Sequence, residues 1–210
     1  ALMVSHRFQL SANRTARLRE RAESQGVTLY TLLLTAYAEV LRCWSKSPQF
    51  TIALIATQVN KSATRTLVRN PAGVTGLSKR ANLIQAEILN HIQPLTLDGP
   101  YADPLLRDLT RELSNPRLAL GVTQNQEGLS LHWYFNENRF PAQLPQHMFT
   151  ALCELVSEGA LAPEIWEQGG LDLLPSQQRA VRQQANDTQW TLTDNLLHQD
   201  FLEKADCMPE

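Results

Sequence analysis

A chain of 210 residues, 43% of them hydrophobic, is long enough for one domain, or for one domain and a fragment, with a sizeable buried core. Its formal net charge of -2 gives no electrostatic reason to expect nucleic acid as a partner. The 3 cysteines share no short spacing, which favours neither a disulfide framework nor a zinc site. No uninterrupted apolar stretch could cross a bilayer, and the N-terminus lacks a signal-peptide pattern, so we expect a cytoplasmic protein without a membrane partner.

The first predicted elements are a strand over residues 4–10 and a helix over residues 12–25. Ser11 is a good N-cap for this helix, because its side-chain oxygen can accept a hydrogen bond from an unpaired backbone N–H of the first turn. Gly26 then ends the helix. Because the chain opens directly on a strand, we expect it to start partway through a larger protein or to have been trimmed there.

Residues 27–57 predict a buried helix that leads into a buried strand. Thr28 can cap the helix, and Pro48 stops it because proline has no N–H to donate. Apolar side chains recur every three or four residues and extend almost all the way round, as in a helix covered by neighbours; they are Leu29, Leu32, Leu33, Leu34, Ala36, Tyr37, Ala38, Val40, Leu41 and Trp44. The apolar, β-branched residues 50–55 favour an inner strand, and a buried helix before such a strand predicts an α/β layer fold.

The middle of the chain predicts a long loop and two helices. Residues 58–76 are polar and have no clear period, which favours a loop. Residues 77–92 form an amphipathic helical pattern. Asp103 and Pro104 are a typical cap and first residue for a further helix over residues 103–113.

A hairpin and a last large helix come next along the chain. Residues 116–123 and 129–135 read as two strands joined by a hairpin connection. In the second strand Leu129, Leu131 and Trp133 alternate with polar residues, so we expect one face to be buried and His132 to lie on the outward face. Residues 146–157 have the pattern of an amphipathic helix.

Three stretches resemble a known family. AYAEVLRCWSKSPQFTI at residues 36–52 and GLSLHWYFNENRFPAQLPQHMFTALCELV at residues 128–156 resemble the C-terminal half of heterocyclization domains. These domains are the cyclizing branch of the condensation domains of nonribosomal peptide synthetases. From LDLLPSQQRAVRQQANDT onward, residues 171–209 resemble the linker into an adenylation domain and the opening of that domain.

The resemblance implies a chloramphenicol-acetyltransferase-like half domain of α/β class, with a mixed β-sheet of about four strands covered by helices. It assigns residues 1–165 to an apparently shortened C-terminal lobe and residues 166–210 to a linker and the start of an adenylation domain. It implies an adjoining adenylation domain and carrier-protein domains as partners. The carrier proteins would bring a phosphopantetheine arm, and we expect no cofactor to bind the chain directly.

The same family contributes a threonine from a PVVFTS-like strand and an aspartate from a TPQVxLD motif to cyclodehydration. The best match to the second motif, residues 115–121, places Gly121 at the aspartate, and glycine has no proton to give or take. The first motif is not visible, and Thr123, the nearest threonine, falls outside any matching motif. Asp103 and Asp108 mimic the spacing of the family's DxxxxD signature, which belongs to the N-terminal half, so coincidence is the better interpretation.

No residue is therefore predicted to be catalytic, to bind a cofactor or to bind a metal, and the 5 histidines show no metal-ligand spacing. The sequence favours a degenerate, non-catalytic heterocyclization lobe that serves as a structural and docking platform for an adenylation domain. The alternative is one lobe of an active condensation or heterocyclization domain that joins and cyclizes carrier-bound aminoacyl substrates. A third possibility is a free-standing docking module that binds a carrier protein.

Overall fold

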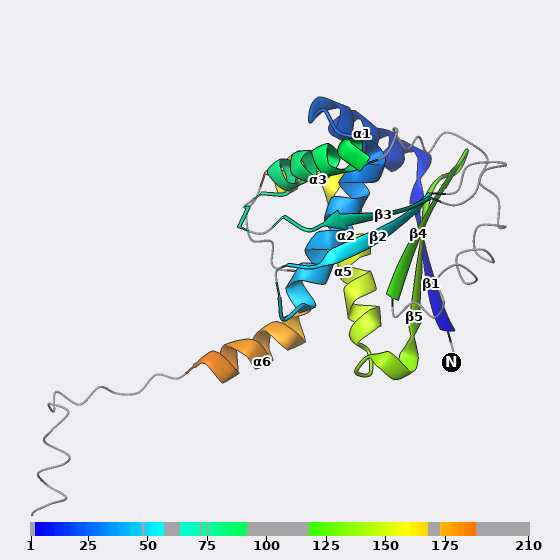
Figure 1. Ribbon diagram of the computed structural model, residues 1–210. Coiled ribbons are helices and arrows are strands. Elements are labelled where there is room, and N and C mark those ends of the chain that lie inside the picture. Colours follow the sequence, from blue (N-terminus) through cyan, green and yellow to red (C-terminus); the bar gives the residue numbers. More distant parts are fainter. Residues whose placement is uncertain are drawn as a thin grey trace, which may run out of the picture. The chain divides into compact units, whose positions relative to one another are not determined.

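Figure 1 shows a computed structural model of the chain, which describes residues 3–47, 49–56, 64–71, 73–74, 76–91, 118–167 and 173–187. The chain divides into two compact units, Ala1–Leu174 and Pro175–Glu210. The first unit holds all the described strands and all but one of the described helices. In the second unit the described element is helix α6 (Ser176–Asn186), whose described side chains are mostly exposed.

Three strands form an antiparallel sheet in the order β1-β5-β4. They are β1 (Met3–Ser11), β4 (Leu118–Asn125) and β5 (Gly128–Asn136). The predicted hairpin is confirmed, with a tight turn at Gln126 and Glu127 between β4 and β5. The predicted buried face of β5 is confirmed, since Leu129, Leu131 and Trp133 are each 0% exposed, but Ser130 on the opposite face is buried as well, at 2%.

Four long helices complete the first unit: α1 (Ala12–Ser24), α2 (Leu29–Trp44), α3 (Leu77–His91) and α5 (Leu144–Gly159). Both predicted caps are present, because Ser11 accepts a hydrogen bond from the Arg14 N–H and Thr28 accepts one from the Thr31 N–H. Gly26 has φ of 69°, a left-handed conformation that suits glycine after a helix. Two short 3-10 helices, η1 (Glu137–Arg139) and η2 (Pro163–Trp166), flank α5.

Helix α2 is the centre of the core, as its sequence predicts. It packs against α1, α3 and α5, and in Figure 1 it lies with α5 on one side of the β1-β5-β4 sheet. The Tyr37 ring meets the Trp133 ring edge-on at 5.7 Å, and the Phe149 ring of α5 lies 5.6 Å from Trp133. Trp44 corrects one expectation, since it lies at the end of α2 and is only partly buried against the core.

The second sheet corrects two further predictions. Strand β2 (Thr51–Ala56) pairs antiparallel with β3 (Thr64–Arg69), so part of the predicted loop is a strand. Among the described strands β2 pairs with β3 alone, so in this part of the chain it is an edge strand of a two-stranded sheet rather than the predicted inner strand. The α/β class is confirmed, but the described strands form two antiparallel sheets rather than one mixed sheet of about four strands. The predicted helix over residues 103–113 lies outside the described residues.

Candidate functional site

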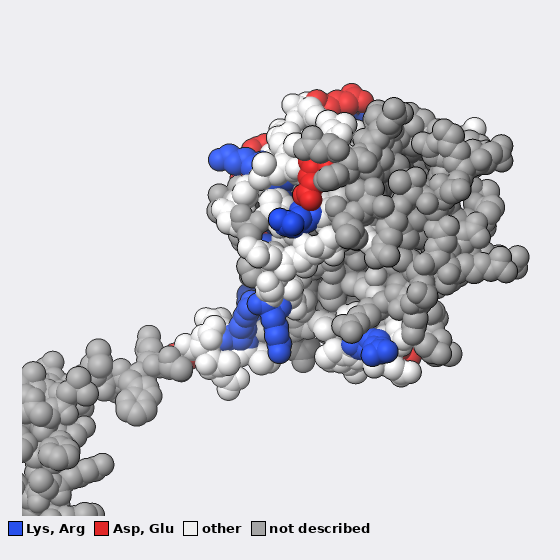
Figure 2. All heavy atoms as spheres, viewed as in Figure 1, with Lys and Arg blue, Asp and Glu red and all other residues white. Residues whose placement is uncertain are grey.

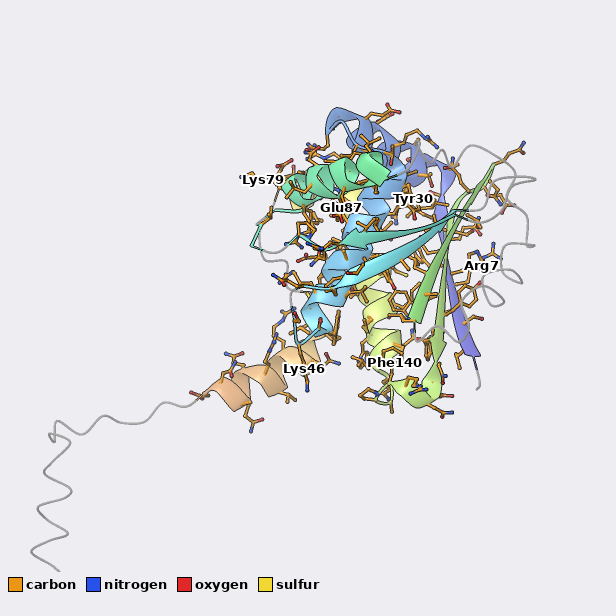
Figure 3. All side chains as sticks on the ribbon, viewed as in Figure 1. Arg7, Tyr30, Lys46, Lys79, Glu87 and Phe140 are labelled. Carbon is orange, nitrogen blue, oxygen red and sulfur yellow. The ribbon has the colours of Figure 1, made fainter. Side chains whose placement is uncertain are left out.

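The polar face of the β1-β5-β4 sheet gathers the residues that the sequence singles out. In antiparallel sheets, directly paired residues point to the same side. Arg7 pairs with His132, which pairs with Gly121 on its other side, and Ser130 pairs with Thr123. In Figure 3 the Arg7 side chain extends from β1 on the side of the sheet away from α2 and α5. The opposite face of β5 is the one that packs into the core.

The side chains on this face contact one another. The Thr123 hydroxyl lies 3.3 Å from the Nε2 atom of His132. The His132 and Tyr134 rings stack with 7° between their planes and 6.4 Å between their centroids. On the same face, from the neighbouring strand β1, the Arg7 guanidinium donates a hydrogen bond of 3.4 Å to the Ser130 hydroxyl. His132 is on the predicted face but is half-buried rather than fully exposed.

Gly121 stands in the middle of this face with neighbours close in front of it. A Cβ atom at this position would lie 3.4 Å from the His132 Cβ and 3.5 Å from the Tyr134 Cε2. These are ordinary van der Waals distances, so a Cβ atom fits at position 121 without a shift of its neighbours.

A second polar cluster lies inside the helical layer. Glu39 of α2 is 2% exposed and forms ion pairs with Arg42 one turn further on and with Arg80 of α3. Arg42 donates from two nitrogens to the two carboxylate oxygens at 2.6 and 3.1 Å. Arg80 also donates to the Val74 carbonyl oxygen at 2.7 Å, and burial lowers the pKa of its guanidinium. The cluster binds α2 to α3 and to the turn before α3, and no sequence pattern predicts it.

The remaining ionisable candidates are separate from both clusters. Cys43 and Cys153 are half-buried, and burial together with the nearby Glu154 carboxylate raises the pKa of the Cys153 thiol to about 12. A thiol with such a pKa is a poor nucleophile at neutral pH. Asp103 and Asp108 lie outside the described residues, and His91 ends α3.

In the part of the chain that the structure describes, no three His, Cys, Asp or Glu side chains come together as a metal site. Helices in the described ranges are all too short or too polar to cross a membrane. On the face drawn in Figure 2, the acidic and basic side chains of described residues occur in small separate groups.

Comparison with known proteins gives the family context. No family model matches the chain. Pyochelin synthetase PchE of Pseudomonas aeruginosa strain UCBPP-PA14 is 26% identical over 249 residues, a match that covers 97% of this chain and 17% of the synthetase. The chain thus spans about one sixth of that relative's length.

Two solved structures share the architecture. The nonribosomal peptide synthetase FmoA3, bound to alpha-methyl-L-serine-AMP, matches with a TM-score of 0.70 and 21% identity over 98% of this chain and 29% of its own. The EpoB cyclization-docking bidomain from Sorangium cellulosum matches with a TM-score of 0.62 and 18% identity over 79% of this chain and 43% of its own. The chain has the fold of a condensation-type domain lobe. The predicted chloramphenicol-acetyltransferase-like class is therefore confirmed, and the polar face described above belongs to a lobe of that kind.

Proposed function

We propose that the chain is a non-catalytic heterocyclization-type lobe that serves as a structural and docking platform for an adjoining adenylation domain in a nonribosomal peptide synthetase. The observation that carries the proposal is the glycine at position 121. The resemblance implies an aspartate at this position, and the chain has instead a residue without a side chain, beside His132 and Tyr134. A position without a proton-transferring group does no acid–base work.

The length of the match supports a shortened lobe. The alignment with pyochelin synthetase PchE runs over 249 positions, which exceeds the 210 residues of this chain by 39. The relative therefore has insertions of at least that length within the matched region. A lobe can lose surface segments more readily than core segments, because loops contribute little to the buried apolar area.

The two solved structures support the assignment of residues 166–210 to a linker and the start of an adenylation domain. The cyclization-docking bidomain of EpoB matches 79% of the chain, whereas FmoA3 matches 98% of it. FmoA3 holds an aminoacyl adenylate, the product of an adenylation reaction. The partners of such a lobe are the adenylation domain and carrier proteins, whose phosphopantetheine arms hold the substrates. The synthetase would act in the cytoplasm.

One observation favours a second function, an active condensation or heterocyclization lobe. The contact of 3.3 Å between Thr123 and His132 is within reach of proton transfer, so this pair could act on a carrier-bound substrate. In that case the acid–base group would come from β5 instead of position 121.

The test compares point variants in a synthetase that contains this chain. In His132→Ala and Thr123→Val, the proposal expects product formation to stay within about twofold of the parent, and removal of a general acid or base would cost roughly 10²–10⁴-fold. Ser130→Ala is the matched control, because it removes a hydroxyl from the same face, beside Thr123, and leaves both groups of the pair in place. A large loss in His132→Ala alone, with the melting temperature unchanged, would establish the active lobe instead.

The platform role needs a separate experiment. Deletion of residues 1–165, with the linker retained, is expected to impair solubility or the adenylation half-reaction without removing a cyclizing step. If adenylation is intact and an uncyclized or unextended intermediate accumulates, the lobe takes part in condensation and the platform proposal fails.

A further inference from the structure

Two consecutive residues at the end of the lobe, Trp166 and Glu167, are held by three helices. Trp166 is 0% exposed, although it lies in the short helix η2 after α5. Its indole N–H donates a hydrogen bond of 3.0 Å to the carbonyl oxygen of Gly159, the last residue of α5. The backbone carbonyl of Trp166 accepts a hydrogen bond of 3.0 Å from the Ser78 hydroxyl at the start of α3. The side chain and the backbone of Trp166 are thereby both held in place.

The fit at Gly159 admits only glycine. A Cβ atom there would lie 2.7 Å from the Trp166 Cζ2 and 2.8 Å from its Cε2 and Nε1 atoms. Real Cβ atoms do not approach ring atoms so closely, so the indole lies directly against the backbone of α5. A glycine near the end of a helix has a cost in backbone entropy, and here the close approach of the indole accounts for it.

Glu167 adds a polar fastening to this packing. Its Oε1 atom accepts from the Arg21 guanidinium at 2.7 Å and from the Gln25 side-chain amide at 3.3 Å. It also lies 3.1 Å from the Ser78 hydroxyl, whose one proton it shares with the Trp166 carbonyl oxygen. Arg21 belongs to α1, Gln25 caps α1, and Ser78 belongs to α3. The Glu167 side chain is nevertheless 60% exposed. An exposed carboxylate gains little from a single ion pair, so three donors from two elements indicate a role in placement more than in stability.

The chain returns to the core once more before the first unit ends. Leu173 is partly buried and packs against the hydrophobic core, and the second unit begins at Pro175. The path out of the lobe is thus fastened at Trp166 and Glu167 and again at Leu173. The fastening fixes where that path starts, whichever domain lies beyond it.

We propose that Trp166, Glu167, Arg21, Gln25 and Ser78 form an exit clamp, a positioning device that fixes the point where the polypeptide leaves the lobe toward the next domain. The name of the next domain rests on the proposed function, whereas the clamp itself can be tested in this chain alone. In a platform, a fixed exit limits the arrangements that the next domain can sample. The clamp residues are then positioning residues for the adenylation domain and touch no substrate.

The first test is amide hydrogen exchange on the 210-residue chain. In Glu167→Gln, the peptide spanning residues 160–167 is expected to exchange roughly tenfold faster, while the peptides of α2 and β5 keep their rates. Glu164→Gln is the matched control, because Glu164 is an exposed carboxylate in η2, the short helix that Glu167 caps. Unchanged exchange in Glu167→Gln, or a rise in every peptide of the lobe, would overturn the proposal.

A charge exchange separates the ion pair from mere packing. Arg21→Glu and Glu167→Arg are each expected to give the fast exchange, and the double variant should restore at least half of the protection, because the opposite charges then face each other again. Protection lost to the same extent in the double variant would show that the ion pair holds nothing in place.

The second test uses a synthetase that contains this chain. Glu167→Gln is expected to lower product formation severalfold while the adenylation half-reaction keeps its rate, because positioning is altered and the adenylation site is not. If product formation is unchanged although residues 160–167 exchange faster, the clamp has no positioning role. Failure of this kind is distinct from failure of the platform proposal, which the deletion of residues 1–165 decides.

Discussion

The buried cluster of Glu39, Arg42 and Arg80 makes a sharp prediction about stability. The Glu39 side chain is 3% exposed and that of Arg80 8%, whereas Arg42 keeps 32% of its surface. Removing one partner of a buried ion pair costs about 3–5 kcal/mol, because the other charge remains buried without compensation. We expect Arg80→Met to lie at the lower end, about 3 kcal/mol, since Arg42 still pairs with the carboxylate. We expect about 4 kcal/mol for Glu39→Met, which leaves the buried Arg80 without an anion.

The decisive variant is the double substitution Glu39→Met with Arg80→Met. Two apolar side chains of similar length replace the pair, and such replacements are often neutral or stabilising. Arg42 can turn to solvent because it is partly exposed. The double variant should therefore be more stable than either single variant, although an additive effect would make it about 7 kcal/mol less stable than the parent.

Urea unfolding at neutral pH measures the four members of this cycle. For a chain of this size, about 3 kcal/mol corresponds to roughly 6–12 °C in melting temperature, which calorimetry resolves easily. If the double variant is destabilised by the sum of the single effects, the two residues act independently. The ion pair would then not be the link between α2 and α3 that the structure indicates.

Three further predictions concern packing and pH. Gly159→Ala should destabilise by about 1–3 kcal/mol, because its Cβ would lie 2.7 Å from the Trp166 ring, and an unchanged melting temperature would contradict that contact. Trp133→Ala should destabilise the fold by about 3–5 kcal/mol because the Trp133 ring is fully buried, and Trp44→Ala should cost clearly less because Trp44 is partly buried. A larger loss of stability for Trp44→Ala than for Trp133→Ala in urea unfolding would refute this packing. Burial raises the pKa of Tyr37 above its usual 10.0, so the unfolded chain ionises first and stability should fall as pH rises above about 10. Tyr37→Phe should flatten that fall, and an unchanged slope would contradict it.

Local signals explain which elements the sequence predicts well. Ser11, Thr28 and Gly26 act within one turn of their helices, so their roles depend on nearby backbone only. The alternation of Leu129, Leu131 and Trp133 fixes the buried face of β5 for the same reason. These elements are present with bounds close to the predicted ones.

Features that depend on residues far apart in the chain could not be predicted from the sequence. Strand β3 is short and polar, and its pairing with β2, with Ile52 opposite Val68, is what makes it a strand. Glu39 reads as an ordinary charged residue of an apolar helix until Arg80, more than forty positions later, is placed beside it. The only local sign was a carboxylate on a helix that is apolar all round, which requires a partner. Glu167 is similar, since its three donors come from α1 and α3.

The two faces of β5 explain how a lobe can keep its fold while its chemistry changes. Side chains alternate with a period of two, so a substitution on one face leaves the packing of the other intact. Trp133 packs against Tyr37 in the core. His132 and Tyr134, one position before and after it, meet Gly121 on the polar face. The resemblance implies a carboxylate at position 121, and glycine in its place removes no core contact because this position lies on the polar face. A platform role requires only the core face of β5. The variants at His132 and Thr123 test whether the polar face has any other role.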